Sequence, residues 1–186
     1  FASQFNAPKN LETPPELEIE DIWILAEFDS TLSVVQSAWV DIDIYTAAQS
    51  IKSFGTGVFP SHWLEMSKSR LYGGDKSATW TLHRIVRDLM SAFSPICPFF
   101  THYLSTTLYG SSSVDVRNFP QLPPSCGVER FDEFRSLTNT LEKFNSMVWK
   151  AKKDLGISLK SPISGIDMPE NLAPFASALT QMHNLE

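Results

Sequence analysis

The sequence predicts a mainly α fold, a helical bundle that carries a small C-terminal α/β appendage. Apolar side chains recur at steps of three and four residues over most of the chain, and glycines and prolines separate these stretches. The length of 186 residues corresponds to about one domain of ordinary size. A hydrophobic fraction of 42%, with 13 Phe and 5 Trp, is enough to build a core, which excludes a disordered chain.

The first helix predicted after the N-terminus is long and amphipathic. Residues 1–15 are expected to be extended, because Pro14 and Pro15 cannot both lie inside a helix. Apolar side chains then follow one helical stripe over residues 30–51, and two nearby glycines end that helix. A shorter helix is predicted over residues 61–72, which a further pair of glycines closes.

Two more helices are predicted on either side of residue 94. The first covers residues 76–93, where apolar side chains share one face. Ser94 directly precedes Pro95, and serine followed by proline suits the N-cap and first position of a helix. A new helix is therefore expected to begin at Pro95. Residues 110–127 are rich in Gly, Ser and Pro and are predicted to form a loop.

The clearest pattern is a seam of seven apolar side chains at alternating spacings of three and four residues. The seam consists of Phe134, Leu137, Leu141, Phe144, Val148, Ala151 and Leu155. It predicts one long helix, which ends at Gly156. Residues 157–168 carry spaced apolar side chains around a proline and a glycine and predict one or two short strands. A last helix is expected over residues 170–183.

These elements divide the chain into three parts: a linker at 1–15, a helical bundle at 16–127, and the long helix with its small tail at 128–186. The net charge of −6 does not favour a polyanion as partner. Charge is distributed unevenly, because the N-terminal quarter is strongly acidic whereas residues 50–90 and 150–160 each have a net charge of +3. Any nucleic acid would have to bind such a local basic region.

Several kinds of site have no support in the sequence. The two cysteines and four histidines are isolated from one another, so we expect neither a disulfide framework nor a metal site. Neither a phosphate-binding glycine loop nor a nucleophile elbow occurs, and we predict no catalytic residue. The richest apolar stretch, residues 92–100, is much shorter than a membrane span, so no membrane contact is expected.

Several short motifs follow one another in the order found in one enzyme family. They are DIWIL at 21–25, then Phe54, Phe59, Trp63, Glu65, Lys68, Arg70, Leu71 and Tyr72, then SPICPFFT at 94–101, and finally residues 114–120. They resemble the DRWIL, F…F…WYIE..K.RLY, APFMPFIT and SVH…WP motifs in the anticodon-binding bundle of the class I aminoacyl-tRNA synthetases for valine, isoleucine and leucine. Arg117 and Phe119 depart from the last of these motifs.

The segment EMSKS at 65–69 also resembles the KMSKS loop that binds ATP in class I synthetases. We reject this match, because Glu65 replaces the first lysine and the segment lies inside a predicted helix. A narrower resemblance concerns the amino acid. FASQF at 1–5 resembles the NASRF helix that leads out of the catalytic domain, and residues 148–162 resemble the archaeal-type valyl pattern of a basic helix end followed by GxSLxxP. The isoleucine enzyme is the alternative.

The resemblance covers residues 1–168 and implies a chain excised from a longer, ATP- and Mg²⁺-dependent valine–tRNA ligase. This part would have no catalytic activity and no cofactor, and would bind the anticodon stem and loop. The implied partners are tRNA(Val) and the catalytic domain of the same chain, in a cytoplasmic protein that we expect to be a monomer. A helical protein-interaction scaffold is an alternative that the acidic N-terminal region favours and the basic regions oppose.

Unstacked anticodon bases need aromatic or guanidinium faces, and phosphates need cations. Candidate tRNA-binding residues are therefore Phe54, Phe59, Trp63, Lys68, Arg70, Arg84, Arg87, Lys143, Lys150 and Lys153. The alternative for the aromatic side chains is burial between helices, and for the two arginines near residue 85 it is a solvated helix face. The three lysines of the long helix share one face, although two of them also suit the negative end of the helix dipole.

Overall fold

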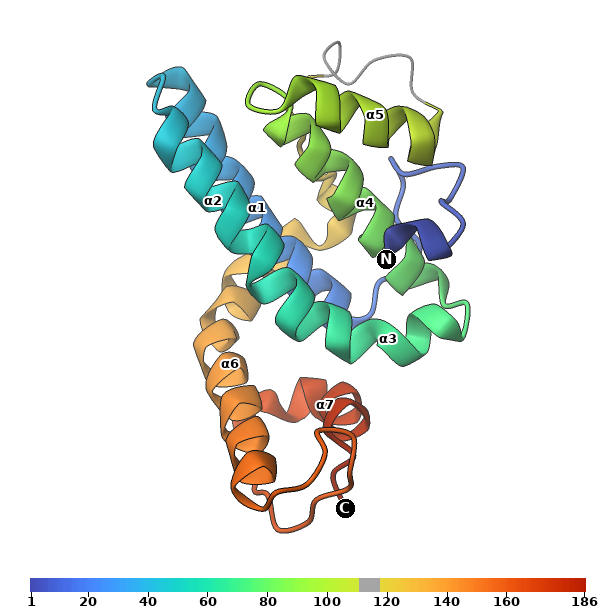
Figure 1. Cartoon of the computed structure of the whole chain (residues 1–186), viewed down its shortest axis with the longest axis vertical. Coiled ribbons are helices and arrows are strands. Elements are labelled where there is room, and N and C mark those ends of the chain that lie inside the picture. Colours follow the sequence, from blue (N-terminus) through green and yellow to red (C-terminus); the bar gives the residue numbers. More distant parts are fainter. Residues whose placement is uncertain (111–117) are drawn as a thin grey trace.

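The computed structural model describes residues 1–110 and 118–186. In these ranges the protein is a helical bundle and contains no β-strand (Figure 1). The helices are α1 (Ile19–Val40), α2 (Ile44–Thr56), α3 (Leu64–Tyr72), α4 (Lys76–Phe93), α5 (Pro98–Tyr109), α6 (Phe131–Asp154) and α7 (Ala176–His183). Short turns of 3-10 or π helix are Ala2–Gln4, Phe59–Trp63, Pro124–Cys126, Val128–Arg130 and Glu170–Phe175. The mainly α fold class is confirmed. The predicted motif over residues 114–120 lies partly outside the described residues.

Helices α1 and α2 form an antiparallel hairpin, whereas the sequence predicted a single helix over residues 30–51. The chain reverses at Ile42, which has a φ of +57°. The Asp43 amide donates to the Ala38 carbonyl at 2.8 Å and the Ile42 amide to that of Trp39 at 3.2 Å, the pattern of a Schellman ending. The left-handed residue after a helix is usually glycine. Because isoleucine occupies it here, the sequence contained no residue that signals the end of α1. Asp43 then caps α2, since its carboxylate accepts from the Thr46 amide at 3.0 Å.

Helix α4 has the predicted bounds, but α5 begins at Pro98 rather than at Pro95. In a helix that starts at Pro95, residue 98 would have to donate its amide hydrogen to the Ser94 carbonyl. Proline has no such hydrogen, so the chain makes a turn over residues 94–97 and places Pro98 at the first helical position instead. Proline does occupy the first position of this helix, as predicted, but the residue is Pro98 and not Pro95.

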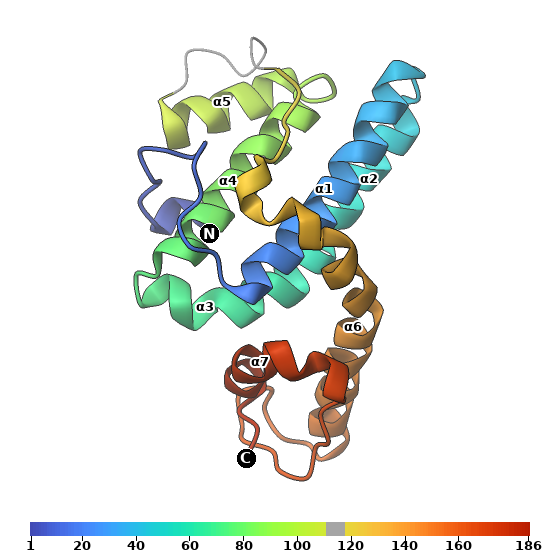
Figure 2. The same cartoon turned by 180° about the vertical axis from the view of Figure 1, so that it is seen from behind.

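Helix α6 leaves the bundle beside α1 and runs away from the α1–α2 tip, and α7 lies beside its C-terminal half (Figures 1 and 2). Helix α6 ends at Asp154, and Gly156, which has a φ of +66°, follows the C-cap residue Leu155. The strands predicted over residues 157–168 are wrong. The described part of the tail has only an isolated bridge between Ile163 and Leu185, because Pro162 and Gly165 leave too short a segment for a ladder.

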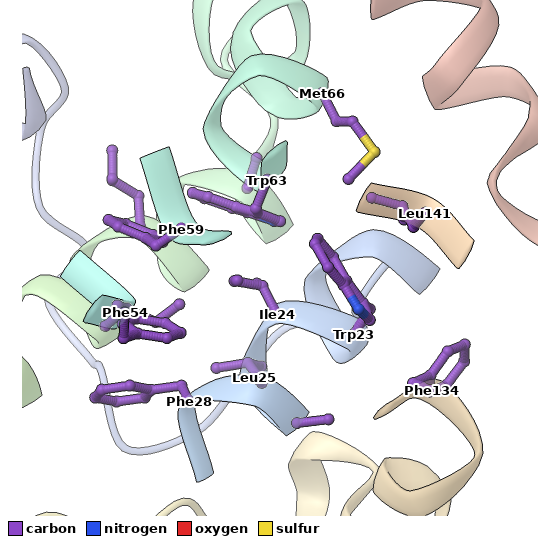
Figure 3. Close-up of a cluster of buried hydrophobic side chains, with 14 of the residues drawn as sticks. Trp23, Ile24, Leu25, Phe28, Phe54, Phe59, Trp63, Met66, Phe134 and Leu141 are labelled. Carbon is purple, nitrogen blue, oxygen red and sulfur yellow. The ribbon is translucent and has the colours of Figure 1, made fainter. Parts of the chain in front are cut away.

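One hydrophobic core joins the bundle, α6 and the tail. It includes Trp23 of α1 and Phe134 of α6, which Figure 3 shows. Phe175 of the tail belongs to the same core, and all three side chains are fully buried. The Trp23 indole also donates to the Thr138 hydroxyl at 2.9 Å, which fixes α6 against α1. The N-terminal segment belongs to the same core through buried Leu11. The three parts predicted from the sequence therefore share one interior.

Candidate functional site

The three aromatic side chains predicted to stack on bases lie in the core. Phe54 and Phe59 have ring centroids 5.6 Å apart, and those of Phe59 and Trp63 are 5.3 Å apart, with nearly parallel planes in both pairs. Exposed fractions are 4%, 8% and 0% respectively. Figure 3 shows this stack facing Ile24 and Phe28 of α1. The rings pack α2 and the following turn onto α1, so the structure corrects their predicted role in base contact and supports the burial alternative.

Arg70 is part of a buried ion-pair cluster around Asp21. The Asp21 carboxylate is fully buried and accepts from the Trp63 indole at 2.9 Å, from Arg70 at 2.6 Å and from the Ser77 hydroxyl. Arg70 also contacts Glu20 and Asp75, each at 2.9 Å. Burial disfavours the charge of Arg70, but these acidic partners outweigh burial and raise its pKa. The guanidinium thus links α1, α3 and α4 through its acidic partners. We therefore remove Arg70 from the candidate tRNA-binding residues.

Arg84 and Arg87 hold the N-terminal segment against α4. Arg84 is 3% exposed, and its guanidinium donates to Asp88 at 2.6 Å and to the Leu11 carbonyl at 2.9 Å. Arg87 pairs with Glu12 at 2.7 Å. Neither arginine presents an unpaired guanidinium to a phosphate. Both the predicted tRNA role and the solvated-face alternative are therefore corrected for Arg84.

The lysine candidates are placed differently from the arginines. Lys68 is partly exposed and pairs with Glu65 at 2.5 Å, three residues earlier in α3. Lys143, Lys150 and Lys153 are exposed on α6 and form no ion pair with any residue that the structure describes. These three cations are therefore the predicted residues that remain available to a polyanion.

An open depression lies at the C-terminal end of the lysine face. It is lined by Trp149, Lys150, Lys153, Gly156, Ile157, Ser158 and Leu159. Trp149 was not among the predicted contact residues, although its position between Val148 and Lys150 in a basic helix end was a usable signal. We call the exposed lysines at 143, 150 and 153, together with this depression, the α6 basic face.

A buried polar network supports the α6 basic face from behind. The His183 ring nitrogen Nε2 lies 2.7 Å from the Asn145 amide oxygen, and the Asn145 amide nitrogen lies 2.9 Å from Nδ1 of His62. His62 also stacks on Trp149, with ring centroids 5.6 Å apart. These contacts join the turn before α3, the middle of α6 and the end of α7. They fix the orientation of the tryptophan ring.

Lys152 faces the opposite way from its exposed neighbours and is fully buried. Its ammonium donates to three carbonyl oxygens, those of Leu159 and Ser161 at 2.7 Å each and that of His183 at 2.6 Å. Burial lowers its pKa. One side chain thus satisfies all three of its donors and fastens both the loop after α6 and the end of α7.

This network predicts a loss of stability in mild acid. Burial, the Lys152 charge and His62 lower the pKa of His183 from 6.5 to about 4. A depressed histidine pKa adds stability that is complete above about pH 6.5 and is lost as the pH falls towards 4, because the unfolded state then binds the proton more strongly. We expect His183 to contribute about 2 kcal/mol less to the free energy of unfolding at pH 5 than at pH 7.

Urea denaturation at both pH values measures this effect. His183→Gln, which keeps a donor for Asn145, should lose less stability between pH 7 and pH 5 than the unchanged protein does. Acidic groups such as Glu27, whose pKa burial raises, are common to both proteins and cancel in the comparison. His102→Gln removes an exposed histidine and serves as the control. Identical pH dependence in the His183 variant and the unchanged protein would contradict the prediction.

Other kinds of site find no support in the described ranges. Among residues 1–110 and 118–186, no group of three or more His, Cys, Asp or Glu side chains is arranged to hold a metal ion. No described helix is both long enough and apolar enough to cross a membrane. Cys126 is buried, and burial raises the pKa of its thiol to about 12, which leaves it unreactive.

Sequence comparison places the chain in a family. The family model for the anticodon-binding domain of tRNA ligases matches residues 21–166, which covers α1 to α6 and the start of the tail. The chain belongs to this family of anticodon-binding domains.

Archaeal valine–tRNA ligases are among the similar proteins. The enzyme of Saccharolobus solfataricus is 30% identical over 161 residues, which cover 86% of this chain and 19% of that protein. The enzyme of Aeropyrum pernix is 29% identical over 176 residues, 90% of this chain and 21% of that protein. The enzyme of Pyrobaculum aerophilum is 28% identical over the whole chain and 23% of that protein. The chain thus spans about a fifth of the length of these relatives.

Proposed function

We propose that this chain is the anticodon-binding part of a valine–tRNA ligase, and that it binds the anticodon stem and loop of tRNA(Val) through the α6 basic face. The observation that carries this proposal is the set of exposed, unpaired lysines at 143, 150 and 153, which lie inside the region matched by the family. Cations free of carboxylate partners can neutralise phosphates without first breaking an ion pair. The similarity to archaeal valine enzymes supports valine over isoleucine.

The proposal assigns binding and orientation to this chain and chemistry to another part of the same polypeptide. The joining of valine to tRNA(Val) with ATP and Mg²⁺ would occur in a catalytic domain that is not included in this sequence. This chain would hold the tRNA so that its acceptor end reaches that domain, a contribution made through positioning rather than bond making. We expect the whole enzyme to act as a cytoplasmic monomer.

Replacing Lys143, Lys150 and Lys153 together with alanine tests the proposal. We expect the affinity for tRNA(Val) to fall by roughly 100- to 500-fold at about 0.1 M salt, because each of the three lost phosphate contacts removes about 0.7 to 0.9 of a decade at that salt concentration. The plot of log affinity against log salt should become shallower by about 2 to 3. Fluorescence anisotropy with labelled tRNA(Val) at several salt concentrations measures both quantities.

The matched control replaces Lys9, Lys52 and Lys76 with alanine, since these lysines are also exposed but lie outside α6. It changes the net charge equally and should leave the salt dependence almost unaltered. An equal loss in both triple variants would indicate general electrostatic attraction and overturn the assignment to α6. A tRNA(Val) with a substituted anticodon and the isoleucine tRNA test the choice of tRNA, because both should bind more weakly.

A further inference from the structure

Trp149 differs from the tryptophans of the core because it lies at the surface of α6. Trp23 and Trp63 are fully buried and Trp80 is 2% exposed, whereas Trp149 is half-buried at the surface of α6. His62 covers one face of its indole ring with an interplanar angle of 26°. The edge-on contact with His183, centroids 5.8 Å apart, fixes a second side. The ring is therefore held on two sides, and Trp149 also lines the open depression.

The depression combines apolar surface with positive charge. Ile157 and Leu159 line it together with Trp149, and Leu159 is 55% exposed. Lys150 and Lys153 lie at its rim, and the exposed side chain of Lys160 follows directly in the chain. Asp154 is the acidic residue in this stretch. A flat aromatic ring next to several cations suits a planar group that is attached to an anion.

We propose that this depression binds one unstacked nucleobase of a single-stranded RNA loop, with the base on Trp149 and its flanking phosphates near Lys150 and Lys153. The inference rests on the proposed function, which it extends by naming the stacking residue. Stacking on an aromatic ring is tolerant of base identity, since every base has a π face. The site thus anchors one nucleotide of the loop, and other contacts select the sequence.

Charge complementarity favours RNA over an apolar protein partner at this site. Two other groups of exposed apolar side chains lie at the α1–α2 tip, where Val40, Ile42 and Tyr45 are 77 to 80% exposed, and on α5, where Phe99, Phe100 and Tyr103 are 59 to 90% exposed. That tip carries Asp41 and Asp43, which would repel phosphates. The Trp149 depression has the opposite sign of charge. Helix α5 has no lysine or arginine between Pro98 and Tyr109, so of these three described surfaces the one on α6 offers cations to a polyanion.

The test combines variants of the protein with variants of the RNA. The probe is the anticodon stem-loop of tRNA(Val), in which each loop nucleotide in turn is replaced by an abasic site. We expect Trp149→Ala to lower the affinity for the intact stem-loop by roughly 5- to 150-fold with little change in the salt dependence. One abasic position should weaken binding to the unchanged protein but have no further effect on Trp149→Ala. Trp149→Phe should keep most of the affinity, because phenylalanine retains an aromatic face.

Intrinsic fluorescence gives a readout that does not depend on the stability of the alanine variant. RNA should quench the tryptophan emission of the unchanged protein, and Trp149→Phe should abolish most of this quenching. Trp39→Phe, which removes another half-buried tryptophan near the C-terminal end of α1, should leave the quenching unchanged. Suppose that Trp149→Ala binds the intact stem-loop with normal affinity and still loses affinity at the same abasic position, whereas the lysine triple variant binds weakly. That result would overturn the stacking site and leave the proposed function intact. Failure of the unchanged protein to bind the stem-loop would overturn both.

Discussion

Replacing Asp21 with alanine is expected to destabilise the protein by about 3 to 5 kcal/mol, the cost of removing one partner from a buried charge cluster. The variant leaves the Trp63 indole, the Ser77 hydroxyl and one arm of the Arg70 guanidinium without their shared acceptor in a site that water does not reach. Such a loss is a large fraction of the roughly 5 to 15 kcal/mol that stabilises a typical domain. Urea denaturation measures it directly.

Asp29→Ala is the matched control, because it removes a carboxylate from the same helix. Asp29 is partly exposed and lies 3.9 Å from Arg135, so its replacement should cost less than about 1 kcal/mol. If the two variants lose equal stability, the Asp21 cluster does not stabilise the packing of α1, α3 and α4. The same experiment would then reopen a binding role for Arg70.

The Asp21 cluster also explains why the family was recognisable from short motifs. Asp21 opens the DIWIL motif, and its partners Trp63 and Arg70 belong to the second motif about 40 residues later. The motif residues that suggested RNA contact are thus the residues that hold the helices together. A sequence shows that aromatic and basic side chains lie near one another along the chain, but not whether a carboxylate from another helix already binds them.

Helical periodicity predicted most of the fold because each helix buries one continuous stripe. It identified α4 and α6 closely, where the stripes end at Phe93 and near Gly156. It failed at Ile42, because the stripe of α1 continues in register into α2 and a β-branched residue occupies the left-handed position. A backbone reversal that depends on hydrogen bonds to Ala38 and Trp39 leaves no periodic trace in the sequence.

The candidate site was predicted in part, and the failures share a cause. Lys143, Lys150 and Lys153 were recognised because a helical wheel places them on one face, which is a local property. Trp149 was missed as a contact residue because its exposure depends on His62 and His183, which are 87 and 34 residues away in the sequence. Lys152 contributes to the basic region at residues 150–160, and its burial could not be predicted for the same reason, since its carbonyl partners come from later segments.

Replacing Lys152 with methionine is expected to release the C-terminal tail while the bundle stays folded. Methionine fills a similar volume but donates no hydrogen bond, so the carbonyls of Leu159, Ser161 and His183 lose their shared donor. Leaving buried acceptors unsatisfied costs about 1 to 3 kcal/mol for each group that water cannot reach. Since the contacts of Lys152 lie within α6 and the tail, the substitution should lower the free energy of local opening of the tail and not that of global unfolding.

Amide hydrogen exchange distinguishes local from global opening. The Ile163 amide donates to the Asn184 carbonyl at 3.0 Å and the Glu186 amide to the Ile163 carbonyl at 3.1 Å, so both report on the tail. In Lys152→Met their exchange should be about 100-fold faster, which corresponds to roughly 3 kcal/mol, while amides of α1 remain protected. Lys153→Met removes an exposed lysine from the same turn and should leave tail exchange unchanged.

Because the tail carries His183, which contacts the Trp149 ring, Lys152→Met should also weaken RNA binding more than the loss of a single charge explains. Unchanged exchange at Ile163 and Glu186 would show that the loop and α7 are held by apolar packing instead of by the buried ammonium.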